Sequence, residues 1–269
     1  MRSATRGWVG SLGLATALIL AGCGAAATNT GGGSGAGGSS SAGGKATTTG
    51  TTGGSGGGGA NCKAGTAAAT ASGWTMLCIA YNEQVFGVAN AASPTPCFDQ
   101  GGNCLDPTDP AWPKPDTVAA ASGVSFWFPA TGGGKTAVKS AINIGPEEGG
   151  TFTQAVPAGK YKNLAILAGV GNGPGTADLE FNYTDGSKDT ATVQFDDWCA
   201  SSPTGSTGFM PADRWSNAGV TTTPACGVFV YQVPIPGAAK TLKQIVLTND
   251  SANASDTEIE MLALSLQAG

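Results

Sequence analysis

The side chains best suited to chemistry in this sequence are a small group of acids, tryptophans and one arginine. An indole ring can stack on the apolar side of a pyranose, while carboxylates and a guanidinium bind its hydroxyl groups. Two of the acids directly precede a tryptophan, and the only arginine after residue 6 precedes another tryptophan. The predicted carbohydrate-binding residues are therefore Asp196, Asp197, Trp198, Arg214, Trp215 and Trp112.

The same residues also have structural interpretations. A tryptophan beside a half-cystine, as Trp198 is, is typical of a buried plug in a small core. Arg214 has an ion-pair partner in either Asp213 or Asp197. Trp112 stands between two prolines and is expected to be the most exposed of the tryptophans. The tryptophans that lie in predicted strands, and are therefore expected in the core, are Trp74 and Trp127.

Paired carboxylates would be needed for a glycosidase, and a retaining enzyme holds them about 5–5.5 Å apart across a cleft. The candidate pairs are Glu147 with Glu148, and Glu258 with Glu260. The first pair lies beside a Gly-Gly turn, in an expected exposed loop. The second pair shares one side of a predicted strand and is expected to face solvent. A carboxylate-based glycosidase therefore stays the weakest alternative, and no catalytic residue is predicted.

The chain contains no histidine. This absence excludes Ser-His-Asp and Cys-His catalysis in their usual forms and removes the commonest ligand of transition metals. Hard oxygen ligands for a structural Ca²⁺ occur in the acidic loop Asp106–Asp109 and at Asp196 and Asp197, without the spacing of an EF-hand. No other cofactor is expected.

Six cysteines follow residue 60, and an even number in an exported chain predicts a disulfide framework. They are Cys62, Cys78, Cys97, Cys104, Cys199 and Cys226. Six cysteines allow 15 connectivities. Our hypothesis is pairing between nearest neighbours, which joins Cys62 to Cys78, Cys97 to Cys104 and Cys199 to Cys226. No Cys-x-x-Cys spacing supports a zinc site.

Strand signals recur from residue 74 onward, whereas helix signals do not. Apolar and polar residues alternate over 177–183, the period of a half-buried strand, and Asp185-Gly186 then predicts a hairpin. Pro157-Ala158-Gly159 predicts another turn. Strands are expected at 74–81, 124–128, 136–144, 151–155, 163–169, 177–183, 190–195, 228–233, 242–248 and 258–266. Such a pattern predicts an all-β fold, a β-sandwich of jelly-roll type, with residues 84–120 as a loop-rich elaboration.

The N-terminus has the order of charges and apolar residues that marks a secretory signal. Arg2 and Arg6 precede an apolar run over 8–21, which is too short for a comfortable membrane span. The run ends in Leu20-Ala21-Gly22-Cys23, which resembles the bacterial lipobox. The resemblance implies removal of residues 1–22 and acylation of Cys23, with palmitate as a typical acyl chain. Gly24 after the cysteine implies the outer membrane in a Gram-negative cell, and a Gram-positive cell would carry the protein on its cell membrane.

Residues 23–60 follow as the cysteine and a linker that is almost wholly Gly, Ser, Thr and Ala, with Lys45 as its one charged residue. A chain of this kind buries too little apolar surface to order itself, and it spans roughly 30–35 Å. The remaining domain, 61–269, carries 10 of the 13 Lys and Arg and all 18 Asp and Glu, a net charge of −8. This charge argues against nucleic acid as a partner and leaves the lipid as the one expected membrane contact.

Several motifs of the second half occur together in one known module. They are Val156-Pro157-Ala158-Gly159-Lys160-Tyr161, Tyr183-Thr184-Asp185-Gly186, Asp196-Asp197-Trp198 and the late apolar run 261–266. The stretch from about 150 to 267 resembles a β-sandwich module that accompanies catalytic domains in bacterial and fungal glycoside hydrolases. The resemblance implies a non-catalytic, carbohydrate-associated role on the cell surface. The alternative is a structural or adhesive envelope lipoprotein that binds a protein partner.

Overall fold

The structure is a computed structural model that describes residues 62–83, 85–86, 103–114, 116–128, 130, 139–145, 150–216, 219–221, 226–251 and 257–269. The predicted signal peptide, the lipobox and the linker lie outside these residues, as do Cys97, Glu147 and Glu148. The described residues form strands and loops. None of them belongs to a helix that could cross a membrane.

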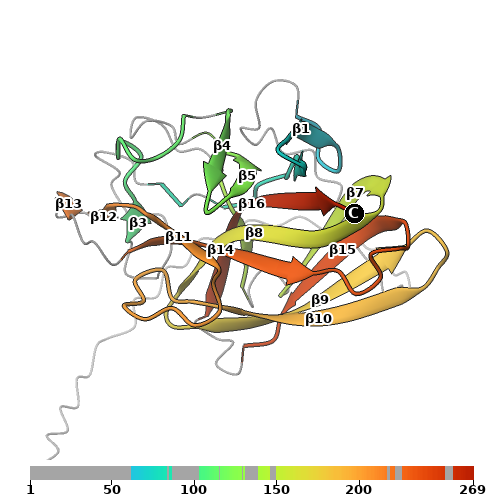
Figure 1. Ribbon diagram of the computed structural model, residues 1–269. Coiled ribbons are helices and arrows are strands. Elements are labelled where there is room, and N and C mark those ends of the chain that lie inside the picture. Colours follow the sequence, from blue (N-terminus) through green and yellow to red (C-terminus); the bar gives the residue numbers. More distant parts are fainter. Residues whose placement is uncertain are drawn as a thin grey trace, which may run out of the picture. The chain divides into compact units, whose positions relative to one another are not determined.

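Seven strands form the larger of two central antiparallel sheets. They are β1 (Ala67–Ala71), β2 (Trp74–Leu77), β6 (Ile142–Ile144), β8 (Tyr161–Gly171), β11 (Gly208–Pro211), β14 (Gly227–Pro234) and β16 (Glu258–Ala268). Their order is β1-β2-β16-β8-β14-β11, and β6 also pairs with β16. The two longest strands, β8 and β16, lie side by side in the middle of this sheet (Figure 1).

The smaller central sheet has four strands, which are β7 (Thr151–Gly159), β9 (Gly175–Tyr183), β10 (Lys188–Phe195) and β15 (Leu242–Asn249). Their order is β10-β9-β15-β7. Leu179, Phe181 and Tyr183 point from β9 into a hydrophobic core that also contains Leu164 and Ile166 of β8. The two sheets therefore pack face to face, and the predicted all-β sandwich is confirmed. Its jelly-roll type stays a prediction.

The larger sheet is buried on its other face as well. Ala165 and Leu167, which alternate with the inward residues of β8, belong to a second core together with Leu262, Phe126 and Trp198. A strand that is buried on both faces needs a continuous apolar run, which explains why the sequence of β8 hardly alternates.

A third layer covers this second core. Its short strands are β3 (Cys104–Leu105), β4 (Val118–Ala121), β5 (Val124–Trp127), β12 (Arg214–Ser216) and β13 (Gly219–Thr221). They form a three-stranded sheet, β13-β12-β3, and a β4-β5 hairpin. Figure 1 shows β4 and β5 on one side of β8 and β16, with β9 and β10 on the opposite side.

Each strand predicted from the sequence overlaps an observed strand, although β2 ends at Leu77 rather than at residue 81. The strands that the sequence did not indicate are β1, β3, β4, β11, β12 and β13. All of them are two to five residues long. The sequences of β1 and β4, AAATA and VAAA, have no polar–apolar alternation from which a strand could be predicted.

The two predicted turns differ in outcome. Asp185 and Gly186 do form the hairpin between β9 and β10, and Gly186 has the positive φ of 85° that glycine tolerates. The turn predicted at 157–159 is wrong, because β7 continues to Gly159. Only Lys160 separates β7 from β8, so the chain passes there from the smaller sheet to the larger one.

Two of the three predicted disulfides are present between described residues. One joins Cys62 to Cys78 and fastens the start of the domain to the end of β2. The other joins Cys199 to Cys226 and closes the segment that contains β11, β12 and β13. Cys104 is also disulfide-bonded, and its predicted partner Cys97 lies outside the described residues.

Because the larger sheet and the third layer share the second core, we expect the third layer to unfold together with the sandwich. Phe126→Ala removes a fully buried ring of the second core and should lower the free energy of unfolding by about 3–5 kcal/mol. Chemical denaturation followed by fluorescence and by circular dichroism should give one coincident transition. Val118→Ala, at an exposed position of β4, is the control and should change stability by less than about 0.5 kcal/mol. Separate transitions would show that the layer is not part of the cooperative unit.

Candidate functional site

The carboxylate of Asp196 is buried and serves the loop that follows it. Its Oδ1 accepts the backbone N–H of Thr204 at 2.8 Å, and its Oδ2 accepts that of Ser206 at 3.0 Å. The backbone N–H of Asp196 donates to the hydroxyl of Tyr231 at 2.8 Å, and burial raises the pKa of that phenol. Asp196 therefore fixes the 200–207 loop from inside and does not offer its oxygens to a sugar.

Asp197 also bonds to the backbone. Its Oδ2 accepts the N–H of Gly173 at 2.9 Å, and its Oδ1 accepts the N–H of Cys199 at 2.8 Å. A bridge between Asp197 and Val170 sets the residue beside the end of β8. The Asp-Asp-Trp motif is thus a connector that joins β10 to the larger sheet and to the Cys199–Cys226 disulfide.

Two of the predicted sugar-stacking tryptophans are buried. Trp198 lies in the second core, as the structural interpretation had it. Trp112 was expected to be exposed, and this expectation is wrong, because only 7% of its surface is accessible. Its ring contacts Phe86 and Phe128 edge-on, with centroid distances of 5.1 and 5.9 Å. Neither indole presents a face to a ligand.

Arg214 and Trp215 are half-buried on β12. Their backbone pairs with Leu105 and Cys104 of β3, so both belong to the three-stranded sheet of the third layer. Trp74 is buried as expected, while Trp127 is only half-buried. The predicted carbohydrate site is therefore divided between a core, a connector and a small outer sheet.

The acidic loop considered for Ca²⁺ is organised by hydrogen bonds within the chain. Asp106 accepts the N–H and the hydroxyl of Thr108 at 2.9 and 2.8 Å, and Asp109 accepts the N–H groups of Ala111 and Asp213. Burial raises the pKa of Asp213, and the neighbouring carboxylates of Asp109 and Asp106 raise it further. Among the described residues, no three acidic, cysteine or histidine side chains form a group that could hold a metal ion.

The second glutamate pair does not face solvent as predicted. Glu260 is completely buried in β16, opposite Gly169 of β8 and Asn143 of β6, and Glu258 is half-buried. The prediction failed because the strand was treated as half-exposed, whereas β16 contributes residues to both hydrophobic cores. The pair Glu147 and Glu148 lies outside the described residues.

A surface that the sequence reasoning did not select is the outer face of the smaller sheet. Three rows of residues cross its four strands as neighbours in register. In the order β7, β15, β9 and β10, the rows are Thr151, Thr248, Asp178, Thr192, then Thr153, Val246, Glu180, Thr190, and finally Ala155, Gln244, Asn182, Lys188. We call these twelve residues the polar outer face. Most are exposed or half-exposed, and none is aromatic.

Hydrogen bonds hold the side chains of the polar outer face in place. Thr192 donates its hydroxyl to Asp178 at 2.9 Å, while Lys188 and Asn182 both donate to Oε1 of Glu180 at 2.9 Å. The hydrogen bond from Lys188, followed by that from Asn182, lowers the pKa of Glu180. The face therefore presents ordered hydroxyl, amide and carboxylate groups on a grid of roughly 4.8 by 6.7 Å.

The sequence did indicate this face, through the alternation of polar and apolar residues along its strands. Thr190, Thr192 and Gln194 alternate with Ala191 and Val193, and the same pattern recurs in β7 and β9. The prediction from sequence missed this face because it relied on tryptophans as the marker of a sugar-binding surface, and this face has none.

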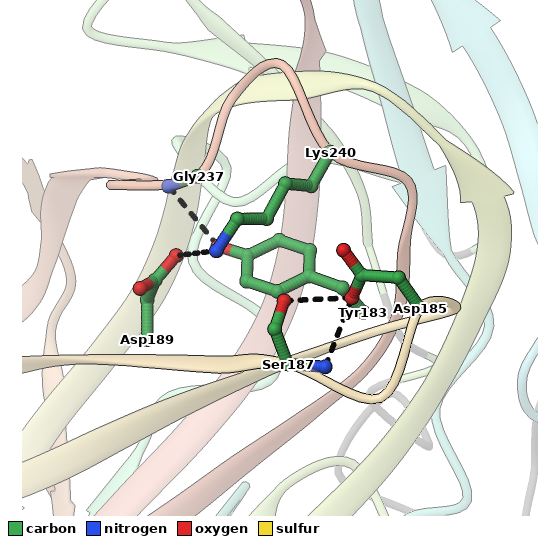
Figure 2. A network of polar contacts seen from close by, with 6 residues as sticks. All are labelled: Tyr183, Asp185, Ser187, Asp189, Gly237 and Lys240. Carbon is green, nitrogen blue, oxygen red and sulfur yellow. Dashed lines mark hydrogen bonds and ion pairs between the residues drawn. The ribbon is translucent and has the colours of Figure 1, made fainter.

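One polar network closes the end of the smaller sheet, and Figure 2 shows its members around the ring of Tyr183. The phenol oxygen accepts the N–H of Gly237 at 3.1 Å. Lys240 lies over the ring with its Nζ 4.8 Å from the centroid, and it pairs with Asp189 at 3.1 Å. Burial raises the pKa of Tyr183 to about 12, and Asp189 adds to this effect. The network fixes the 235–241 connection against the β9-β10 hairpin and pairs Lys240 with Asp189.

No family model matches this chain, and no curated protein matches it significantly.

Asp196 should be a structural residue. Asp196→Asn replaces one acceptor oxygen by a donor, so a buried N–H of the 204–206 backbone loses its partner. The free energy of unfolding should fall by about 2–3 kcal/mol, measured by urea titration. Asp250→Asn, at an exposed aspartate, is the control. Equal stability of the two variants would contradict the role given to Asp196.

Gly237 has no room for a side chain, because a Cβ there would lie 2.5 Å from the Tyr183 oxygen and 2.6 Å from Asp189 Oδ2. Gly237→Ala should therefore lower the free energy of unfolding by about 1–3 kcal/mol. Thermal unfolding checks this against Ala239→Ser, an exposed position in the same connection. An unchanged melting temperature for Gly237→Ala would show that the connection is loose.

Proposed function

We propose that this protein is a lipid-anchored, non-catalytic carbohydrate-binding module, and that its binding surface is the polar outer face. The acylated Cys23 and the linker would hold the sandwich away from the membrane. The anchor is in the outer membrane if the cell is Gram-negative and in the cell membrane if it is Gram-positive. The fold supports this function through one feature, which is the contrast between the two central sheets.

That contrast is the observation on which the proposal rests. The larger sheet contributes to a core on each of its faces, so its central strands β8 and β16 offer a ligand no open face, and exposed side chains occur on its edge strands β1 and β11. Among the residues that the structure describes, the smaller sheet contributes to a core on its inner face alone. Its outer side chains are mostly polar, since three neighbouring rows carry hydroxyl, amide and carboxylate groups, with Val246 and Ala155 as the apolar members.

The chemistry of the polar outer face suits a hydroxyl-rich polymer. The carboxylates of Asp178 and Glu180 are acceptors for sugar hydroxyls, while threonine hydroxyls donate and accept. A neutral hydrogen bond contributes only about 0.5–1.5 kcal/mol, so one sugar would bind weakly. A polysaccharide whose repeating sugars follow the rows would make many such contacts at once. Binding to a polymer should therefore be much stronger than binding to one sugar.

The geometry does not suit hydrolysis. Asp178 and Glu180 are two residues apart on one strand and lie on an open sheet surface, not on opposite sides of a cleft. Glu180 is hydrogen-bonded to Lys188, which keeps its pKa low and makes it a poor general acid.

The test is retention of the full-length, unacylated chain on insoluble and immobilised polysaccharides. Thr153→Val/Thr190→Val removes two hydroxyls from the middle row without changing the size of the side chains. It should reduce retention roughly tenfold, by the value of two hydrogen bonds. Thr70→Val, at an exposed threonine of β1 in the other sheet, is the matched control and should bind like the unmodified protein.

No retention on any polysaccharide would overturn the proposal and favour the alternative of a structural or adhesive lipoprotein with a protein partner. Retention that falls equally in the Thr70 variant would place the binding surface elsewhere.

A further inference from the structure

The four outer strands of the two central sheets differ in how their free edges are protected. Edge strands usually avoid pairing with other chains through proline, a bulge or shortness. β7 contains Pro157, β11 has four residues and ends in Pro211, and β1 has an irregular register between Ala67 and Ala69. β10 has none of these features, since its eight residues pair with β9 without a shift and contain no proline.

The backbone polar groups of β10 that face away from β9 can be identified. Thr176 donates its N–H to Ser251 and accepts the N–H of Asp250, so its backbone bonds lie on the β15 side. Its partner in β10, Gln194, therefore has no backbone bond to β9. Because this pattern has a period of two residues, Thr192, Thr190 and Lys188 likewise direct their N–H and C=O groups outward.

Only part of this edge is open. At its C-terminal end, Gly205 lies so close to the carbonyl of Gln194 that a Cβ on Gly205 would overlap it. The 200–207 loop thus covers the end of β10. The open edge runs over residues 188–192, where Lys188, Thr190 and Thr192 are all exposed.

We propose that this open edge pairs with the same edge of a second copy of the chain, antiparallel and with the two-fold axis at Thr190. Outward-facing backbone groups must then meet one another, which sets Thr190 opposite Thr190 and Lys188 opposite Thr192 of the second copy. The two smaller sheets join into one eight-stranded sheet. Their polar outer faces become a single continuous surface.

Charge complementarity favours a second copy over an unrelated strand. Lys188 lies on the outer side of the sheet, next to Thr192 of the second copy in this register. The hydroxyl of Thr192 is bonded to Asp178 in its own chain, at 2.9 Å. Lys188 pairs with Glu180 of its own chain at 2.9 Å, so in the dimer each ammonium would lie between this carboxylate and Asp178 of the other copy, and the symmetry makes this arrangement twice. No like charges face each other at the open edge.

The interface is small, because five residues pair on each side. Stable protein complexes usually bury about 1,200–2,000 Å², and a single strand pair falls below this range. The dimer should therefore dissociate on dilution. An anchor that holds both copies in one membrane would raise their effective concentration.

The experiment combines cross-linking with sedimentation of the full-length, unacylated chain. Thr190→Cys sets two cysteines across the proposed axis with their Cα atoms about 5.5 Å apart, within the range of a disulfide. Thr153→Cys is the matched control, because it is also an exposed threonine of the polar outer face on an edge strand of the same sheet. We expect the Thr190 variant to form a disulfide dimer at least tenfold faster.

Thr190→Pro tests the same edge without a thiol. The backbone N–H of Thr190 does not bond to β9. Proline at this position therefore leaves the hydrogen bonds between β9 and β10 intact, while it blocks pairing with a second copy. We expect concentration-dependent dimers for the unmodified chain and for Thr153→Pro, and monomers for folded Thr190→Pro. The proposal is overturned if the unmodified chain is monomeric throughout, if the two cysteine variants cross-link equally, or if folded Thr190→Pro still dimerises. Each result leaves the polysaccharide test unaffected.

Discussion

The rest of the domain depends on one constraint, which is that the larger sheet is buried on both faces. β8 and β16 are the longest strands, and almost every residue in them is inaccessible to solvent. Such strands cannot be stable unless apolar layers cover both sides. The smaller sheet provides one layer, and the short strands of the third layer provide the other. The disulfide between Cys199 and Cys226 closes the segment that carries part of this cover.

The same constraint explains why the motif that looked most like a binding site in the sequence has a structural role. Asp196, Asp197 and Trp198 occupy the point where the chain leaves the smaller sheet on its way to β11 of the larger sheet. A connector at this point must satisfy the backbone N–H groups of a tight loop, and buried carboxylates do so well. An indole at the same point fills the second core. The motif is therefore explained by packing and hydrogen bonding, without a ligand.

The sandwich was predictable from the sequence because β7, β9, β10 and β15 face a core on one side and solvent on the other, which produces alternation. The third layer was not predictable in the same way. Its strands are short and contain many small residues, and their positions depend on contacts with β8 and β16 that are distant in sequence. The wrong predictions for Trp112 and Glu260 have the same origin, since Trp112 is buried in the second core and Glu260 lies in a strand that contributes to both cores. The polar outer face was visible as alternating polarity, but its rows exist only once the register between strands is known.

The most direct test of this account is residue-resolved solvent accessibility, measured by NMR with a soluble paramagnetic probe. Methyl groups of Thr151, Thr153, Thr190 and Thr248 should be strongly attenuated, because the outer face of the smaller sheet is open. Methyl groups of Leu167, Val230 and Leu262 should be protected, because the third layer covers them. Attenuation of the second set as strong as that of the first would contradict a larger sheet that is covered on both faces.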